Sequence, residues 1–206
     1  MRTGLERLDA LRDKKVVPEW SLPPFAPASS ITILAFDQSM AKTGWALMSS
    51  EYPYVLMAGT LSTTAVETGY EGDFQRVVEL HLDMTKIIRG NYHSHGFENP
   101  TLVAHESPPV GSVIGGGRSS IMSACALRVA AAEAWLPTHM VGAQRAKTRL
   151  TGKRDATKQE VGVAILEMWP HLSIMKPWNE AVRDAIAIGV VAIEEYQGEH
   201  HDQPAH

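Results

Sequence analysis

Four carboxylates stand where apolar segments begin or end, and together they could bind metal and support hydrolysis. Asp37 and Glu106 each end a largely apolar run that is typical of a buried strand. Asp184 precedes an apolar helical segment, and Glu180 lies one helical turn before it. In a mixed sheet the two strand ends can lie side by side at one edge, where α/β proteins normally bind ligands.

Converging carboxylates are costly as anions, and a divalent cation removes that cost. Mg²⁺ prefers oxygen ligands, usually a few carboxylates with water and substrate phosphate. Two such ions about 3.5–4 Å apart can activate a water and stabilise the leaving oxygen in phosphodiester hydrolysis. The alternative is that Asp37 and Glu106 are ordinary strand-end acids and that Asp184 caps a helix. The residues alone leave both interpretations open.

The composition limits the classes of protein. The chain has 206 residues, a formal net charge of −4 and one cysteine. This length fits one α/β domain with short tails, and a single cysteine excludes a disulfide scaffold or a cysteine-rich zinc module. No segment reaches the roughly 18 consecutive apolar residues of a membrane helix, so we expect a cytoplasmic protein with no membrane partner. Cys125, among small residues, should be a buried, inert thiol.

The elements that must position the acids follow from the hydrophobic pattern, which predicts a mixed α/β sheet. Expected strands are 31–37, 43–48, 54–61, 101–106 and 138–141, and expected helices are 72–91, 119–135, 144–150, 155–169 and 179–196. Residues 1–30 should form a short helix and a Pro-rich linker, 31–197 one domain, and 198–206 a disordered tail. Trp45, Trp135 and Trp169 are expected in the core.

At this point several motifs, in order, resemble those of RuvC-type Holliday junction resolvases in the ribonuclease H-like superfamily. They extend over about residues 31–193, and their order and spacing are more specific than any one of them. The matching segments are 35–46 (AFDQSMAKTGWA), 103–106 (VAHE), 152–161 (GKRDATKQEV) and 183–188 (RDAIAI), with Lys147 eleven residues before Lys158.

The resemblance implies a ribonuclease H-like five-stranded sheet, with three antiparallel strands, then βα units, and helices on both faces. It implies a metal-dependent endonuclease that cuts four-way or other branched DNA junctions. Catalysis would use two Mg²⁺ or Mn²⁺ ions on Asp37, Glu106, Asp184 and, as fourth ligand, Glu180, with Lys158 at the reacting phosphate. Members act as homodimers on the two-fold symmetric junction, and we take 119–135 as the interface helix, although core packing explains that segment equally well.

The sequence departs from the family pattern at three places. Ser39 stands where the family usually has glycine, and Ala181 stands where it has a fourth acid or histidine, so that we expect Glu180 to substitute from the preceding position. Pro109 replaces an aromatic residue that the family uses in the junction centre. The short, divergent form resembles phage-encoded relatives, which would place it in the host cytoplasm.

A compact basic strip accompanies the motifs. Between Arg145 and Lys158 lie six basic residues and one acid, and the mild negative total averages this strip with an acidic tail that contains Glu194 and Glu195. We expect DNA contacts from Lys147, Lys158, Arg145, Arg149, Lys153, Arg154 and Arg118. Binding through such a strip should depend strongly on salt.

Two other functions compete with the nuclease. An actin-like ATPase also begins with an acidic strand end, but it needs glycines in the following turn, and residues 38–40 supply none. A non-catalytic junction-binding or scaffold protein is the second alternative, should the fourth metal ligand be absent.

Overall fold

The computed structural model describes residues 31–51, 54–64, 69–108, 117–174 and 178–201. The expected helix and linker in 1–30, the residue Pro109 and the loop up to residue 116 lie outside the described residues. So does 202–206, the last part of the expected tail.

A five-stranded mixed sheet forms the centre of the fold, in the order β3-β2-β1-β4-β5. β1 (Thr32–Asp37), β2 (Lys42–Ser49) and β3 (Val55–Ser62) form an antiparallel meander. β4 (Leu102–Glu106) lies parallel to β1, and β5 (Thr138–Val141) lies parallel to β4. The predicted order of elements and the mixed sheet are confirmed.

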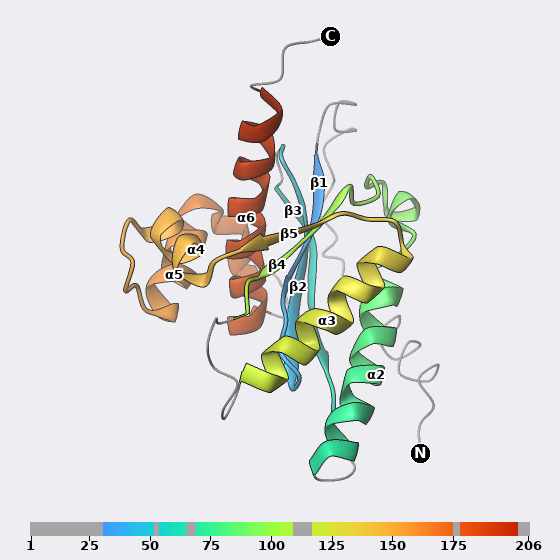
Figure 1. Cartoon of the computed structure of the whole chain (residues 1–206). Coiled ribbons are helices and arrows are strands. Elements are labelled where there is room, and N and C mark those ends of the chain that lie inside the picture. Colours follow the sequence, from blue (N-terminus) through green and yellow to red (C-terminus); the bar gives the residue numbers. More distant parts are fainter. Residues whose placement is uncertain (1–30, 52–53, 65–68, 109–116, 175–177, 202–206) are drawn as a thin grey trace.

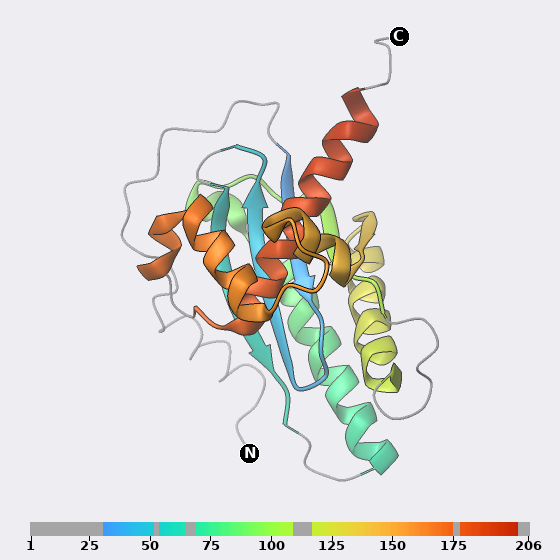
Figure 2. The same ribbon diagram turned by 90° about the vertical axis from the view of Figure 1, so that its left-hand side faces the viewer.

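Helices cover both faces of this sheet, as predicted (Figure 1). α2 (Gly69–Ile88) and α3 (Gly117–Glu133) pack against each other on one face. α6 (Glu180–His201) crosses the other face over β1 and β2, with α4 (Ala143–Thr151) and α5 (Lys158–Met168) packed beside it (Figure 2). Short 3-10 helices at Tyr92–His95 and Pro170–Ile174 complete the described elements.

The central strand β1 contributes side chains to two separate hydrophobic cores, because successive side chains point to opposite faces of the sheet. Ile33 and Ala35 join the core under α6, whereas Leu34 and Phe36 join the core under α2 and α3. All four side chains are fully buried. A strand covered on both faces reads as a continuous apolar run, which is why the sequence alone located it.

Helix boundaries and two buried positions differ from expectation. α5 begins at Lys158 rather than 155 because Thr157 and Glu160 form a reciprocal capping box there. α6 continues to His201, past the predicted end of the ordered domain. Cys125 is exposed, so its predicted burial is wrong. Trp135 is 93% exposed with a φ of 60°, just after α3 ends, and its predicted place in the core is also wrong.

In the part of the chain that the structure describes, no helix combines the length and apolar character needed to cross a membrane.

Candidate active site

The ends of β1 and β4 bring two of the predicted acids together. The parallel register pairs Phe36 with His105, which leaves Asp37 beside Glu106 one residue further on. Both acids follow an alanine of the α6-side core by two positions, so both side chains project toward the face that α6 covers. His105 points the other way, because side chains alternate along a strand, and it is fully buried.

Gln38 locks the two strand ends at this register. Its side-chain amide accepts a hydrogen bond from the Glu106 backbone N–H (3.1 Å) and donates one to the Glu106 carbonyl (2.6 Å). Gln38 is buried, and its amide thereby extends the ladder between β1 and β4 by one residue. Sequence reasoning missed this residue, because a glutamine in a turn carries no local sign of a partner 68 positions away.

The turn after Asp37 is closed without the glycine that the family usually has. The Ser39 N–H donates to the Thr43 hydroxyl (3.1 Å), and that hydroxyl donates to the Ser39 carbonyl (2.8 Å). Ser39 does not adopt a positive φ, the backbone conformation that would favour glycine. Serine therefore fits this turn, and the departure from the family pattern has a structural explanation.

Close approach of α6 to the sheet brings the third acid to the same edge. A Cβ on Gly44 of β2 would lie 1.9 Å from the Ala181 carbonyl oxygen, and one on Gly189 would lie 2.3 Å from the Met48 sulfur. At Gly44 the contact is with backbone, so only glycine permits this spacing there, whereas a Cβ at Gly189 would have to displace the Met48 side chain. Between these contacts, Asp184 is held over the ends of β1 and β4.

These elements enclose a cavity of about 190 Å³. Asp37, Glu106 and Asp184 line it together, and two lysines complete its polar wall: Lys147 from α4 and Lys158 from the start of α5. The remaining lining is Ala143, Ala146, Val161, Ala187 and Ile188. The structure thus gathers three of the four predicted acids and both predicted lysines, and it leaves Glu180 outside the lining.

Burial is the main cause that raises the pKa values of all three acids. Burial, then the Asp184 and Glu106 carboxylates, raise the pKa of Asp37 from 3.8 to about 7, and Lys158 offsets this only in part. Burial and Asp184 raise the pKa of Glu106, and burial raises that of Asp184 despite Lys158. A carboxyl group poised near neutrality by burial and like charge is typical of functional sites.

Lys158 bridges the cavity to the surface. Its ammonium lies 3.2 Å from an Asp184 carboxylate oxygen and forms an ion pair with Glu180. These contacts raise the pKa of Lys158 to about 12, and Lys158 lowers that of Glu180. Glu180 is 56% exposed, against 25% for Asp184. Asp184 is not the helix cap, because Asn179 accepts the hydrogen bond from the Val182 N–H.

The donor set fits a hard cation such as Mg²⁺ or Mn²⁺, since all three acids offer carboxylate oxygens. The raised pKa values of all three acids indicate that their negative charge is unfavourable in this cavity, and a bound cation would offset that cost. Among the described residues, however, no three His, Cys, Asp or Glu side chains are grouped so that they could hold a metal ion as they stand. The Lys158 ammonium, not a shared central point, is what Asp184 faces.

Acidic groups of α6 neutralise much of the basic strip. Arg149 forms two hydrogen bonds with Glu194 (2.6 and 2.5 Å), and Arg145 lies 2.6 Å from Glu195. The charge count assigned these two acids to the acidic tail, but they lie within α6, as the predicted helix over 179–196 placed them. The strip is therefore less positive than its sequence suggests, although Arg145 and Arg149 remain largely exposed.

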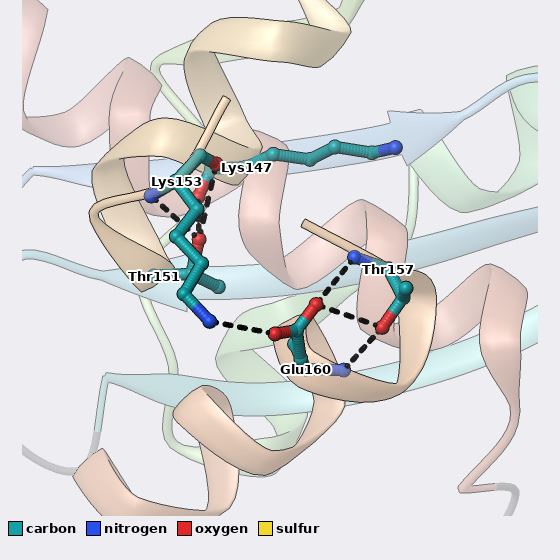
Figure 3. A network of polar contacts seen from close by, with 5 residues as sticks. All are labelled: Lys147, Thr151, Lys153, Thr157 and Glu160. Carbon is teal, nitrogen blue, oxygen red and sulfur yellow. Dashed lines mark hydrogen bonds and ion pairs between the residues drawn. The ribbon is translucent and has the colours of Figure 1, made fainter. Parts of the chain in front are cut away.

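Lys153 and Arg154, also in the strip, form contacts that connect α4 with α5. Lys153 pairs with Glu160 (2.9 Å), which also accepts from the backbone and hydroxyl of Thr157 (Figure 3). Arg154 donates to Gln144 of α4. Lys153, Thr157 and Glu160 line a second cavity of about 380 Å³. Lys147 extends away from this network in Figure 3 and lines the acidic cavity instead.

Arg118 lies far along the chain from the strip, at the start of α3. Its guanidinium stacks over the Tyr70 ring at 5.1 Å from the centroid. Both residues are exposed.

The sheet order and helix placement define an α/β fold of the ribonuclease H-like class. No family model and no curated protein matches this chain. Among solved structures, Thermus thermophilus RuvC is similar, with a TM-score of 0.60 and 20% identity over 82% of this chain and 97% of that chain. T. thermophilus RuvC in complex with a Holliday junction substrate gives a TM-score of 0.63 and 20% identity, over 82% and 96%.

The yeast mitochondrial Holliday junction resolvase Ydc2 is also similar, with a TM-score of 0.48 and 12% identity over 98% of this chain and 90% of that chain. Within the ribonuclease H-like class, the fold of this chain is of the RuvC type.

Proposed function

We propose that this protein is a metal-dependent, structure-selective endonuclease that cuts four-way or other branched DNA junctions by phosphodiester hydrolysis. The observation that carries this proposal is that Asp37, Glu106 and Asp184 line one cavity together with two lysines, on a RuvC-type fold. Thermus thermophilus RuvC has been solved with a Holliday junction substrate, which makes branched DNA the first substrate to test.

Asp37, Glu106 and Asp184 would hold Mg²⁺ or Mn²⁺, with two ions per site. Bound there, the ions would supply a water of lowered pKa and a positive charge at the leaving oxygen. The three acids must be ionised to bind, so the raised pKa of Asp37 predicts weaker metal binding below neutral pH.

Two lysines give the cavity its anion-binding side. Lys147 lines the cavity, and the described residues give it no ion pair. Its ammonium is therefore available to a phosphate oxygen beside the acids. Lys158 is the second, once it leaves Asp184. Preorganised ammonium groups of this kind stabilise the charge that develops on a phosphate during cleavage.

The duplex arms would lie along α4 and the start of α5. Arg145 and Arg149 are exposed even while paired with α6, and phosphates would compete with the α6 carboxylates for them. Lys153 and Arg154 extend this surface toward α5, whereas Arg118 lies at the start of α3, in the segment that follows β4. The salt dependence of binding reports how many of these contacts form.

A homodimer would present two such sites to the two symmetric strands of a junction. α3 carries exposed Ile121, Cys125 and Val129 at a spacing of four, which places them on one face of the helix. Apolar side chains that are 42% and 51% exposed, as Ile121 and Val129 are, favour a second copy of this face as the partner.

The test is cleavage of a labelled four-way junction with Mg²⁺ or Mn²⁺. Paired symmetric nicks are expected from the native chain and none from Asp37→Asn or Glu106→Gln. Asp184→Asn should also lose cleavage while keeping or improving junction binding, because it removes a negative charge beside phosphate. Cleavage retained by all three variants contradicts the proposal.

A non-catalytic junction-binding protein is the second candidate. It is favoured by one observation, that no three described acid, histidine or cysteine side chains are grouped to hold a metal as they stand. Tight junction binding without nicks in either metal, unchanged in Glu106→Gln, would select this alternative.

A further inference from the structure

Lys158 sits where a cation is needed in the acidic cavity. Its ammonium is 3.2 Å from the Asp184 carboxylate and also paired with Glu180. Asp184 lines the cavity and Glu180 does not. Lys158 therefore holds one acid of the cavity and one acid of the surface at the same time.

The placement of the three residues allows Lys158 to move between these partners. Lys158 is the first residue of α5, and its side chain is 54% exposed. Glu180 begins α6, and Asp184 lies one turn later on the same face. An ammonium on a four-carbon stem has three rotatable donors and can change partner without moving either helix.

We propose that Lys158 is an exchangeable internal cation: it occupies Asp184 while the cavity holds no metal, and Glu180 retains it when a divalent ion takes Asp184. The inference rests on the proposed function, because it requires metal binding by Asp37, Glu106 and Asp184. Glu180 is then a positioning residue for Lys158 rather than a metal ligand.

The exchange makes metal and lysine compete for one carboxylate. Removing the ammonium with Lys158→Met should tighten Mn²⁺ binding by about fivefold to tenfold, since a unit charge about 4 Å away repels a cation even when solvent screens it. Lys158→Arg keeps the charge and should bind Mn²⁺ as the native chain does. In the absence of metal, Lys158→Met should lower the melting temperature, because Asp184 loses its counter-ion.

Lys147→Met is the matched control for charge alone. Lys147 lines the same cavity, but among the described residues it forms no ion pair with the acids. Lys147→Met should therefore tighten Mn²⁺ binding by a smaller factor than Lys158→Met does. Equal tightening in both variants would mean simple repulsion and would overturn the exchange.

Glu180→Gln separates a positioning residue from a ligand. Without Glu180, Lys158 stays on Asp184, so Mn²⁺ binding should weaken by about threefold, a change of about 0.7 kcal/mol. In a Lys158→Met background the same change should weaken Mn²⁺ binding less, since only the through-space charge of Glu180 is then lost. A ligand would lose at least as much affinity in that background as in the native one, and that result would overturn the positioning role.

The experiment is a titration of each full-length variant with MnCl₂, in which free Mn²⁺ is followed by electron paramagnetic resonance without DNA. Circular dichroism checks the fold, and Lys158→Gln replaces Lys158→Met if the latter is unfolded. If the native chain binds Mn²⁺ and cuts junctions but Lys158→Met binds no tighter, this inference alone fails. If the native chain neither binds Mn²⁺ nor cuts, the proposed function fails with it.

Discussion

Asp37→Asn should stabilise the metal-free protein at neutral pH, although it removes a residue that the proposed function requires. Asp37 is partly buried beside two other carboxylates, and these surroundings raise its pKa to about 7. Above that pH, Asp37 is an anion in the folded protein, and its charge lowers the free energy of unfolding. Asparagine has almost the same shape and carries no charge to repel Glu106 or Asp184.

The sign and size of the effect follow from linkage. An acid with a higher pKa in the folded than in the unfolded state binds more protons when folded, so stability falls as the pH rises from about 4 to about 7. A shift from 3.8 to about 7 corresponds to at most about 4 kcal/mol, at about 1.4 kcal/mol per unit. Glu106 and Asp184 titrate together with Asp37, which reduces the effect of Asp37 alone. We therefore expect the free energy of unfolding to fall by about 1–3 kcal/mol between pH 5 and pH 7.5.

The assay is urea unfolding in EDTA at several values between pH 5 and pH 8. The native chain should lose stability across this range, and Asp37→Asn should show a flatter profile and a higher free energy of unfolding at pH 7.5. Asp155→Asn, at an exposed position, is the matched control and should follow the native profile. Saturating Mg²⁺ should reduce the difference between the native chain and Asp37→Asn. Parallel profiles for the native chain and Asp37→Asn in EDTA would refute the reasoning.

Three further predictions concern the elements that position the site. Gly44→Ala should destabilise the fold by at least about 3 kcal/mol, measured by denaturant unfolding, because its Cβ would meet the backbone of α6 at 1.9 Å; a change below 1 kcal/mol would contradict this packing. Gln38→Met should cost about 1–3 kcal/mol and reduce cleavage by leaving the Glu106 backbone N–H unpaired, while the Glu106 carbonyl keeps its contact with His105; unchanged stability would show that water replaces the amide. If the native chain is the dimer that we propose, Val129→Asp should sediment as a folded monomer in analytical ultracentrifugation, whereas a dimer that persists in Val129→Asp would exclude this face of α3 as the interface.

The order of elements and three of the site acids could be predicted because their signals are local. Apolar runs and alternation locate β1 and β4, and an acid that ends such a run must lie at the sheet edge. The hydrophobic pattern also predicted Asp184 at the start of a buried helix. What local patterns could not show is how closely α6 approaches β2, because that depends on Gly44 meeting a carbonyl far along the chain.

The remaining errors come from partners that are distant in sequence. Counting charges between residues 145 and 158 overstated the positive strip, because Glu194 and Glu195 fold back on it. Cys125 lies among small residues that favour burial, yet it points away from the sheet on the uncovered face of α3. Neighbouring residue types predict whether a helix forms, but the face that it buries depends on what packs against it.

Two acids of this molecule illustrate the difference between a structural acid and a candidate functional acid. Glu160 accepts hydrogen bonds from Thr157 and pairs with Lys153, and these partners lower its pKa to about 2 (Figure 3). An acid that supports a fold has partners of this kind. Asp37 has burial and two like charges instead, and its pKa rises to about 7. Burial beside like charges is typical of acids that function in binding or catalysis, and it supports the proposal that a cation binds in this cavity.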